Sequence, residues 1–241
     1  MYMNEMAILL AAGMGTRMRP LTENTPKPLI RVNGKPMIET LIDGLQTRGV
    51  KKFFVVAGYL GEQLNYLEQK YDNLRIVFNT EYRTINNISS VYVVADKLIE
   101  ADYDVFICEA DLYISDKNLF KPQLTHSCYF GKLVDGHTDD WVFDIDVDRR
   151  ITRVGKGGDN QFNMVGVSWF KRNDARLLGQ LIKDRYGNPG YEDLFWDDVV
   201  NENLDKLDLI VHAIDAKQVI EIDTVEELTA VDGTYYRALK N

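Results

Sequence analysis

Cysteine and histidine are scarce in this chain. There are two cysteines and three histidines in 241 residues. Cys108 and Cys128 lack the C-x-x-C spacing, and the histidines share no metal-ligand spacing, which argues against a zinc site and a disulfide framework. We expect Cys108, in the apolar stretch V-F-I-C, to be a small buried apolar residue.

Long apolar runs are also missing. No stretch approaches the ~18 apolar residues that a membrane-spanning helix needs. The first five residues, M-Y-M-N-E, lack the basic start and the small-residue cleavage site of a signal peptide. We therefore expect a cytoplasmic protein without a membrane span.

Positive charge is in deficit. Lys and Arg number 28 against 37 Asp and Glu, for a formal net charge of −9. Such a balance repels a polyanion and argues against nucleic-acid binding, whereas a small nucleotide can be neutralised locally. Hydrophobic residues make up 45% of the chain and charged residues 27%, as in ordinary soluble domains. We expect small-molecule substrates as the partners.

Apolar runs alternate with helical patterns in the first half, which predicts strands joined by crossovers and a largely parallel sheet. Expected strands are 6–12, 52–57, 74–78 and 104–108, and expected helices are 36–48, 61–71 and 88–98. The second half predicts an antiparallel or mixed extension: strands 127–133, 141–147, 151–154, 164–170, 207–213 and 218–222, and helices 173–186, 191–203 and one from Thr224. No linker divides them, so we expect an α/β fold in one domain, 1–241. Residues 1–125 would form its nucleotide-binding half, and 126–241 its acceptor-binding half.

Residues 10–35 combine a turn of small residues with a cluster of cations. The turn follows the first expected strand and contains Leu10, Ala11, Ala12, Gly13, Gly15 and Thr16. Its glycines allow close approach to a ligand, and successive N–H groups of such a turn bind anions. Arg17, Arg19, Lys27, Arg31 and Lys35 follow within nineteen residues. Prolines on both sides of Lys27 stiffen its backbone. The segment predicts a triphosphate site, although it matches neither the Walker A pattern nor G-x-G-x-x-G.

Two aspartates follow expected strands and are candidate ligands for Mg²⁺, which prefers one or two carboxylates plus substrate phosphates. Asp111 stands in E-A-D-L-Y and Asp223 in E-I-D-T. Asp223 could instead cap the last helix, where Thr224 and Glu227 match a capping box. We also assign Glu109 to the nucleotide site.

Recognition of the base and the acceptor is predicted from short polar groups and tryptophans. Gly58 could let a planar base lie against the backbone, and Asn86, Asn87, Ser89 and Ser90 offer hydrogen bonds unless they cap a helix. Trp141 and Trp196 stand among carboxylates, a combination that suits an ammonium group. These carboxylates are Asp139, Asp140, Glu192, Asp193, Asp197 and Asp198. The alternative is that the tryptophans belong to the core and the carboxylates to a solvated helix face.

The string L-A-A-G-x-G-T-R-x-x-P-L-T-x-x-x-P-K-P resembles the signature of nucleotidyltransferases that make NDP-sugars and CDP-alcohols. Further segments, including G-V-S, D-L-F-W-D and E-I-D-T, resemble bacterial CTP:phosphocholine cytidylyltransferases over roughly residues 6–228. The resemblance implies a Rossmann-like (GT-A-like) three-layer fold with a mixed, mainly parallel sheet, and CTP, Mg²⁺ and an aminoalcohol phosphate as reactants.

The resemblance also implies roles for individual residues. It maps phosphate binding and catalysis onto Gly13, Gly15, Arg17, Lys27 and Asp111; metal binding onto Asp111 and Asp223, with Asp197 as a competing ligand; and acceptor contacts onto Trp141, Trp196 and Asp197. Glu192, from the same acidic cluster, is assigned to the acceptor site as well. Phosphocholine is the first expected acceptor, and phosphoethanolamine and 2-aminoethylphosphonate are alternatives.

Three other functions stay open at this point. Sugar-1-phosphate nucleotidyltransferases usually carry an E-K-P sequence that is missing here. Lys156 in G-K-G-G is a candidate replacement for its lysine, although a hairpin turn explains that stretch more simply. A non-catalytic nucleotide sensor is a second alternative. A glycosyltransferase is a third, because D-I-D at 144–146 matches a D-x-D metal pair. CTP versus UTP and the oligomeric state are not predicted.

Overall fold

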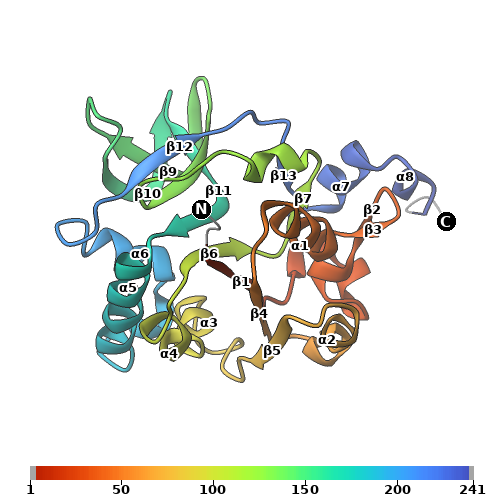
Figure 1. The fold of residues 1–241 in the computed structure, drawn as a ribbon. Coiled ribbons are helices and arrows are strands. Elements are labelled where there is room, and N and C mark those ends of the chain that lie inside the picture. Colours follow the sequence, from red (N-terminus) through yellow and green to blue (C-terminus); the bar gives the residue numbers. More distant parts are fainter. Residues whose placement is uncertain (1–3, 239–241) are drawn as a thin grey trace.

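The computed structural model describes residues 4–238 as helices and strands around one large mixed sheet (Figure 1). The strands are β1 Glu5–Ala11, β2 Arg31–Val32, β3 Lys35–Pro36, β4 Lys52–Ala57, β5 Leu74–Phe78, β6 Asp104–Glu109, β7 Leu112–Ile114, β8 Cys128–Leu133, β9 His137–Ile145, β10 Ile151–Asp159, β11 Phe162–Phe170, β12 Ile210–Ala213 and β13 Val219–Glu221. The helices are α1 Met37–Arg48, α2 Tyr66–Lys70, α3 Ile88–Tyr92, α4 Ala95–Ile99, α5 Arg172–Arg185, α6 Trp196–Asn201, α7 Val225–Val231 and α8 Tyr235–Ala238.

The first half forms the parallel part of the sheet, in the order β6-β1-β4-β5. Every residue of β1 is buried, as expected of a strand covered on both faces. Its alternate side chains enter two different cores. Leu9 packs with α1 on one face, and Ile8 packs with α3 to α6 on the other. The predicted three-layer α/β fold is confirmed.

The second half extends the same sheet with antiparallel strands. β11 pairs with β6, β8 and β9. β10 pairs antiparallel with β9, and β12 pairs in parallel with β8 (Figure 1). The expected mixed extension is therefore present. One detail was wrong: the glycine-rich stretch 155–158 is not a hairpin turn, because it lies inside β10, where it pairs with β9.

Three expected helices are shorter than their patterns suggested. Residues 61–71 form a 3-10 turn, Gly61–Leu64, and then α2, whereas 88–98 divide into α3 and α4. The break between α3 and α4 falls at Val93 and Val94, two consecutive β-branched residues, which have a slightly lowered helix propensity. In 191–203, Leu194 and Phe195 are extended, so that α6 begins only at Trp196.

A short ribbon brings the end of the chain to the end of β6. β7, which follows Asp111, pairs with β13, and Leu112 lies opposite Glu221. The Ile222 N–H also donates to the Asp111 carbonyl at 3.3 Å. Asp111 and Asp223, remote in sequence, are neighbours because each adjoins one strand of this ribbon.

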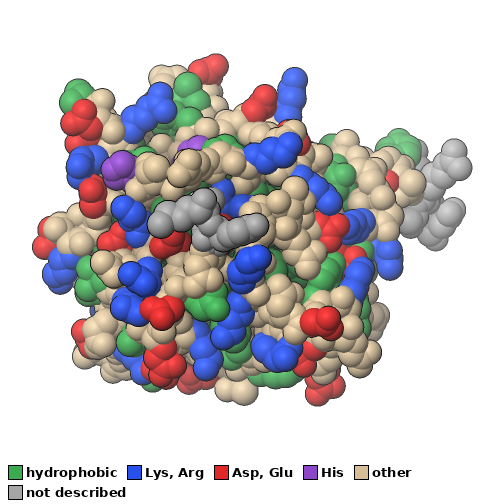
Figure 2. Space-filling model, viewed as in Figure 1, with side chains coloured by type: hydrophobic (Ala, Val, Ile, Leu, Met, Phe, Trp, Pro, Cys, Tyr) green, Lys and Arg blue, Asp and Glu red, His purple; other side chains and the backbone are tan. Residues whose placement is uncertain are grey.

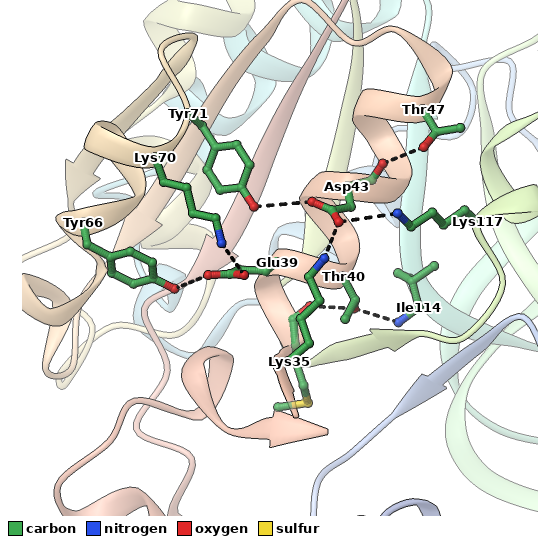
Figure 3. A network of polar contacts seen from close by, with 11 residues as sticks. Lys35, Glu39, Thr40, Asp43, Thr47, Tyr66, Lys70, Tyr71, Ile114 and Lys117 are labelled. Atoms are coloured by element: carbon green, nitrogen blue, oxygen red, sulfur yellow. Dashed lines mark hydrogen bonds and ion pairs between the residues drawn. The ribbon is translucent and has the colours of Figure 1, made fainter. Parts of the chain in front are cut away.

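Helix α1 is tied to its surroundings by the polar network of Figure 3, in which side chains from several elements converge on Glu39 and Asp43. Glu39 accepts from the Tyr66 hydroxyl at 2.8 Å and pairs with Lys70 at 2.7 Å. On the next turn, Asp43 pairs with Lys35 and with Lys117. Thr40, next to Glu39 on the same helix, accepts from the Ile114 N–H at 3.0 Å, which anchors the ribbon strand β7 to α1.

The surface mixes charges of both signs. Lys, Arg, Asp and Glu side chains are interspersed over the face seen in Figure 2, with small scattered apolar areas between them. Within residues 4–238, no helix has the length and apolar character needed to cross a membrane.

Candidate active site

The turn after β1 depends on Gly15. Its φ of 58° is in the left-handed region, and it precedes the 3-10 turn Thr16–Met18. A Cβ here would lie 2.9 Å from Lys27 Cβ and 3.1 Å from Thr22 Cγ2. The Thr22 hydroxyl donates to the Gly15 carbonyl at 2.7 Å. Any larger residue would be strained and would displace Lys27, so Gly15 lets the glycine turn and the P-K-P segment meet.

Lys27 is the central charge of the site. Its side chain is only 9% exposed, and its Nζ lies 2.7 Å from Asp111 Oδ2 and 2.5 Å from Asp223 Oδ1. Burial disfavours the ammonium, but the two carboxylates outweigh that penalty and raise the Lys27 pKa. Arg17 reaches Asp223 from the solvent side at 2.8 Å, with 68% of its side chain exposed. Arg17 is therefore available to an incoming anion, whereas Lys27 is held in place.

Other expected cations lie elsewhere. Arg31 donates to the Gly34 carbonyl, and Lys35 belongs to the network on α1. Arg19 is exposed beyond the glycine turn. Only Arg17 and Lys27 of the five line the cavity described below.

Three carboxylates converge beside Lys27. Oxygen atoms of Asp111, Glu221 and Asp223 lie within 4.8 Å of one another, and Asp111 Oδ1 is buried without a hydrogen-bond partner among the described residues. Glu221 is an exposed residue, yet partial desolvation of its carboxyl group, together with the charges of Asp111 and Asp223, raises its pKa to about 8. Burial and Asp111 likewise raise the Glu109 pKa well above its ordinary value. Such crowding of negative charge suits a divalent cation.

Glu221 was missed by the sequence reasoning. The signal was present in E-I-D, because residues two apart on an extended segment face the same way. The alternative role of Asp223 as a helix cap does not hold: the Thr224 hydroxyl accepts from the Glu227 N–H, and Glu227 reaches back, which completes the capping box. Asp223 is left to face Lys27 and Arg17.

Two adjoining cavities open at the carboxyl ends of β1 and β6, where ligands of α/β sheets bind. The first, about 250 Å³, is lined by Leu10, Ala11, Gly13, Gly15, Thr16, Arg17, Lys27, Pro28, Glu109, Asp111 and Asp223. We call it the cradle. The second, about 360 Å³, is lined by Arg17, Asn87, Glu109, Asp111, Lys132, Asp139, Asp140, Trp141, Lys156, Asn163, Met164, Gly166, Phe195, Asp197, Glu221 and Asp223. We call it the acceptor cavity.

A larger hollow of about 540 Å³ lies at the opposite edge of the sheet. It is lined by Asn4 and Asp104, next to the first residues of β1 and β6, and by the start of α5. None of the predicted site residues lines it.

The acceptor cavity has an aromatic corner formed by Trp141 and Phe195. Their rings meet edge to face, with centroids 5.3 Å apart. Asp139 and Asp140 stand at the exposed rim, next to Trp141. Phe195, like Glu221, is a lining residue that the sequence reasoning did not identify.

Two predicted acceptor residues lie outside this cavity. Trp196 is 3% exposed, and its ring stacks on Tyr129 within the core. Glu192 is exposed in the turn before α6. Adjacent residues at the start of α6 diverge, so Phe195 faces the cavity and Trp196 faces the core. For Trp196, the structure therefore favours the core alternative.

Asp197 lies in the wall of the acceptor cavity, 4% exposed. It accepts a hydrogen bond from the Tyr129 hydroxyl at 2.9 Å. Burial raises the pKa of Asp197 to about 7, although the bond from Tyr129 opposes this. It does not belong to the carboxylate group around Lys27.

The residues expected at the base are engaged with one another. Ser89 and Ser90 accept from the buried Asn79 amide at 2.8 and 3.1 Å. The Asn87 side chain accepts from the backbone N–H of Trp196 at 2.9 Å and donates to the Glu109 carboxylate at 3.4 Å. The Asn79 bonds join the end of β5 to α3, and the Asn87 bonds join the loop before α3 to the start of α6 and the end of β6.

Gly58 is closely surrounded by other residues and leaves no space for a base to lie against it. A Cβ there would meet the Ala12 carbonyl at 2.6 Å and the Tyr82 ring at 2.9 Å. Neither Gly58 nor Ala12 lines the cradle. The D-I-D pair is also occupied, since Asp144 pairs with Arg153 at 2.7 Å.

Comparison with known proteins gives consistent matches. Residues 6–127 match the nucleotidyl transferase family. A 2-aminoethylphosphonate cytidylyltransferase of Lancefieldella rimae is 52% identical over 98% of this chain and 95% of its own length. A choline-phosphate cytidylyltransferase of Streptococcus pneumoniae is 37% identical, over 92% and 94%. A solved structure of the CTP:phosphocholine cytidylyltransferase of S. pneumoniae superposes with a TM-score of 0.85 at 34% identity, covering 99% of this chain and 98% of that one.

Proposed function

We propose that this chain, which belongs to the nucleotidyl transferase family, transfers CMP from CTP to 2-aminoethylphosphonate or a closely similar aminoalcohol phosphate. An oxygen of the acceptor's phosphonate attacks the α-phosphorus of CTP in line, and pyrophosphate leaves. The observation that carries the proposal is the wall shared by the two cavities. Arg17, Glu109, Asp111 and Asp223 line both, so the anionic ends of both substrates would meet there.

The cradle supplies what a triphosphate needs. N–H groups of the turn at Gly13 and Gly15 would bind phosphate oxygens, and Arg17 has the exposure to close over them. Lys27, fixed between two carboxylates, would offset charge that develops during the transfer. Because both reactants are anions, most of the catalysis is alignment and charge stabilisation.

Asp111, Glu221 and Asp223 fit a divalent cation, and the unpartnered Asp111 Oδ1 is the observation that tests this fit. We infer Mg²⁺, the ion that oxygen-only sites beside phosphates usually hold. When bound, it would neutralise phosphate charge and help to orient the triphosphate. The three carboxylates would hold the ion, and Lys27 would keep two of them in position.

The acceptor cavity favours a primary ammonium over a trimethylammonium group. A primary ammonium donates up to three hydrogen bonds, for which the cavity offers carboxylates that include the buried Asp197. A trimethylammonium group donates none and depends on aromatic faces. With Trp196 in the core, Trp141 and Phe195 are the only aromatic side chains among the lining residues of this cavity. We therefore rank 2-aminoethylphosphonate above phosphocholine, which the sequence-based expectation had put first.

Phosphocholine is the second candidate. The aromatic corner and the 37% identity to a choline-phosphate cytidylyltransferase favour it. Its P–O–C linkage and the P–C linkage of the phosphonate present the same attacking oxygens.

Pyrophosphate release measured with CTP and Mg²⁺ across a panel of acceptors tests the proposal. The panel contains 2-aminoethylphosphonate, phosphoethanolamine, phosphocholine and glucose-1-phosphate, with UTP as the alternative donor. We expect the highest kcat/KM with 2-aminoethylphosphonate and CTP. Turnover of glucose-1-phosphate alone would replace this function with a sugar nucleotidyltransferase, and tight CTP binding without any product would favour a nucleotide sensor.

A further inference from the structure

A cation of the protein itself sits at the aromatic corner of the acceptor cavity. Lys156 Nζ lies 5.4 Å from the centroid of the Phe195 ring and 5.7 Å from that of Trp141. Both distances are within the ~6 Å range of cation–π attraction. Lys156 forms no ion pair with any residue from 4 to 238. Its ammonium therefore contacts aromatic rings, although carboxylates line the same cavity.

The strand register puts Lys156 there. Lys156 of β10 lies directly opposite Trp141 of β9, so the two side chains are on one face of the sheet. The register shifts between Lys156 and Gly158, and Gly157 has a φ of 74°. Such an irregularity bends a strand and redirects the neighbouring side chain. The stretch G-K-G-G thus serves to present one lysine, which explains why it is neither a hairpin turn nor a regular strand.

We propose that Lys156 is a specificity-determining residue: its ammonium occupies the Trp141–Phe195 corner and disfavours acceptors with a trimethylammonium group. This inference rests on the proposed function. A trimethylammonium group needs the aromatic faces, and it would have to displace Lys156 against the repulsion of like charges. A primary ammonium can bind the carboxylates and leave the corner to Lys156.

The inference has a definite competitor. Lys156 could instead turn towards the anionic end of the acceptor and bind the phosphonate. Removing the lysine would then weaken the binding of every acceptor alike. If Lys156 instead occupies the aromatic corner, removing it weakens the binding of no acceptor and strengthens that of the trimethylated one. The two roles therefore predict different changes in the ratio of the two kcat/KM values.

The test compares Lys156→Ala and Lys156→Gln with the wild-type enzyme. Lys132→Ala is the matched control, because Lys132 lines the same cavity from β8 and makes no cation–π contact with an aromatic ring in the described part of the chain. We expect both Lys156 variants to raise the kcat/KM ratio of phosphocholine to 2-aminoethylphosphonate by about 10-fold, the effect of one cation–π site. Lys132→Ala should leave this ratio within about twofold. An unchanged ratio, or an equal loss for both acceptors, in the Lys156 variants would overturn the inference.

A binding measurement keeps this test separate from the proposed function. Choline binding to the enzyme is followed by tryptophan fluorescence, which needs no turnover. Lys156→Ala should bind choline about 10-fold more tightly than the wild-type enzyme, even if none of the proposed acceptors is turned over. Equal choline affinities would overturn the role of Lys156, whatever reaction the enzyme catalyses.

Discussion

The two cavities are built by different means. The cradle consists of turns at the ends of parallel strands, such as Gly15 after β1 and Asp111 after β6. The acceptor cavity consists of side chains on the faces of antiparallel strands, such as Trp141 opposite Lys156. A residue at a strand end is identified by its position along the chain. A residue on a strand face is identified only once the strand register is known. The lining residues of the cradle are therefore easier to predict from the sequence than those of the acceptor cavity.

They also differ in electrostatics. In the cradle, each described cation has an anionic partner, with Lys27 and Arg17 both on Asp223. In the acceptor cavity, carboxylates exceed cations, and Lys156 rests on aromatic rings. Substitutions in the cradle should therefore act on the chemical step, and those in the acceptor cavity on the choice of substrate. The predictions below test that division.

The largest effect is expected for Asp111→Asn, which should lower kcat by about 10³-fold because an amide lacks the charge needed to hold a divalent cation. Its control is Asp139→Asn, the same chemical change at the exposed rim, for which we expect kcat to fall by less than about fivefold. Steady-state kinetics at saturating Mg²⁺ measures both, and circular dichroism verifies folding. A folded Asp111→Asn enzyme with nearly native kcat would contradict the metal assignment.

Lys27→Ala should lower kcat by about 10²-fold, because it removes a fixed charge beside the reacting phosphates. The variant also leaves Asp111 and Asp223 without their buried partner, so the apparent affinity for Mg²⁺ should change too. Single-turnover kinetics across an Mg²⁺ titration separates the two effects. If kcat recovers fully at high Mg²⁺, Lys27 acts only by organising the carboxylates.

Substitution of Trp141 and of Trp196 should have different effects on stability and on acceptor binding. Trp196→Ala empties a core position and should reduce the free energy of unfolding by about 3–5 kcal/mol. Trp141→Ala should cost much less stability and should mainly raise the KM for the acceptor. Urea denaturation and acceptor kinetics on both variants give the comparison. An acceptor KM that rises only in Trp196→Ala would reverse the assignment of the two rings.

Among the effects on stability, the smallest is expected for Asp197→Asn, which should change how the free energy of unfolding varies with pH. The folded pKa of Asp197, about 7, exceeds the usual value near 3.8. Folding therefore favours its protonated form, and the wild-type protein loses stability from this group as the pH rises from about 4 to 7.

The Asn variant avoids that loss. Its stability relative to wild type should therefore rise by roughly 2–3 kcal/mol between pH 5 and pH 8, which corresponds to a relative increase in melting temperature of about 5–10 °C. Differential scanning calorimetry at the two pH values measures this, with Asp148→Asn, the same change at an exposed position, as control. A relative melting temperature that is the same at both pH values would show that Asp197 is already ionised in the folded protein at pH 5.

Much of the fold was predictable because it depends on local patterns. The apolar run of β1 and the capping box at Thr224 were both predicted correctly from neighbouring residues. The predictions were less accurate where the sequence was ambiguous. Trp196 had the composition of a binding residue, and only the turn of chain at Leu194 and Phe195 directs it into the core.

By itself the sequence determined the N-terminal part of the cradle: a strand, a glycine turn and a proline-flanked lysine lie within 30 residues, where chain connectivity limits their geometry. The tertiary structure alone decided the rest. The β7–β13 ribbon joins Glu221 and Asp223 to Asp111, and the pairing of β9 with β10 places Lys156 on Trp141. Contacts between distant segments follow from strand register and packing of the whole chain, which no local pattern specifies.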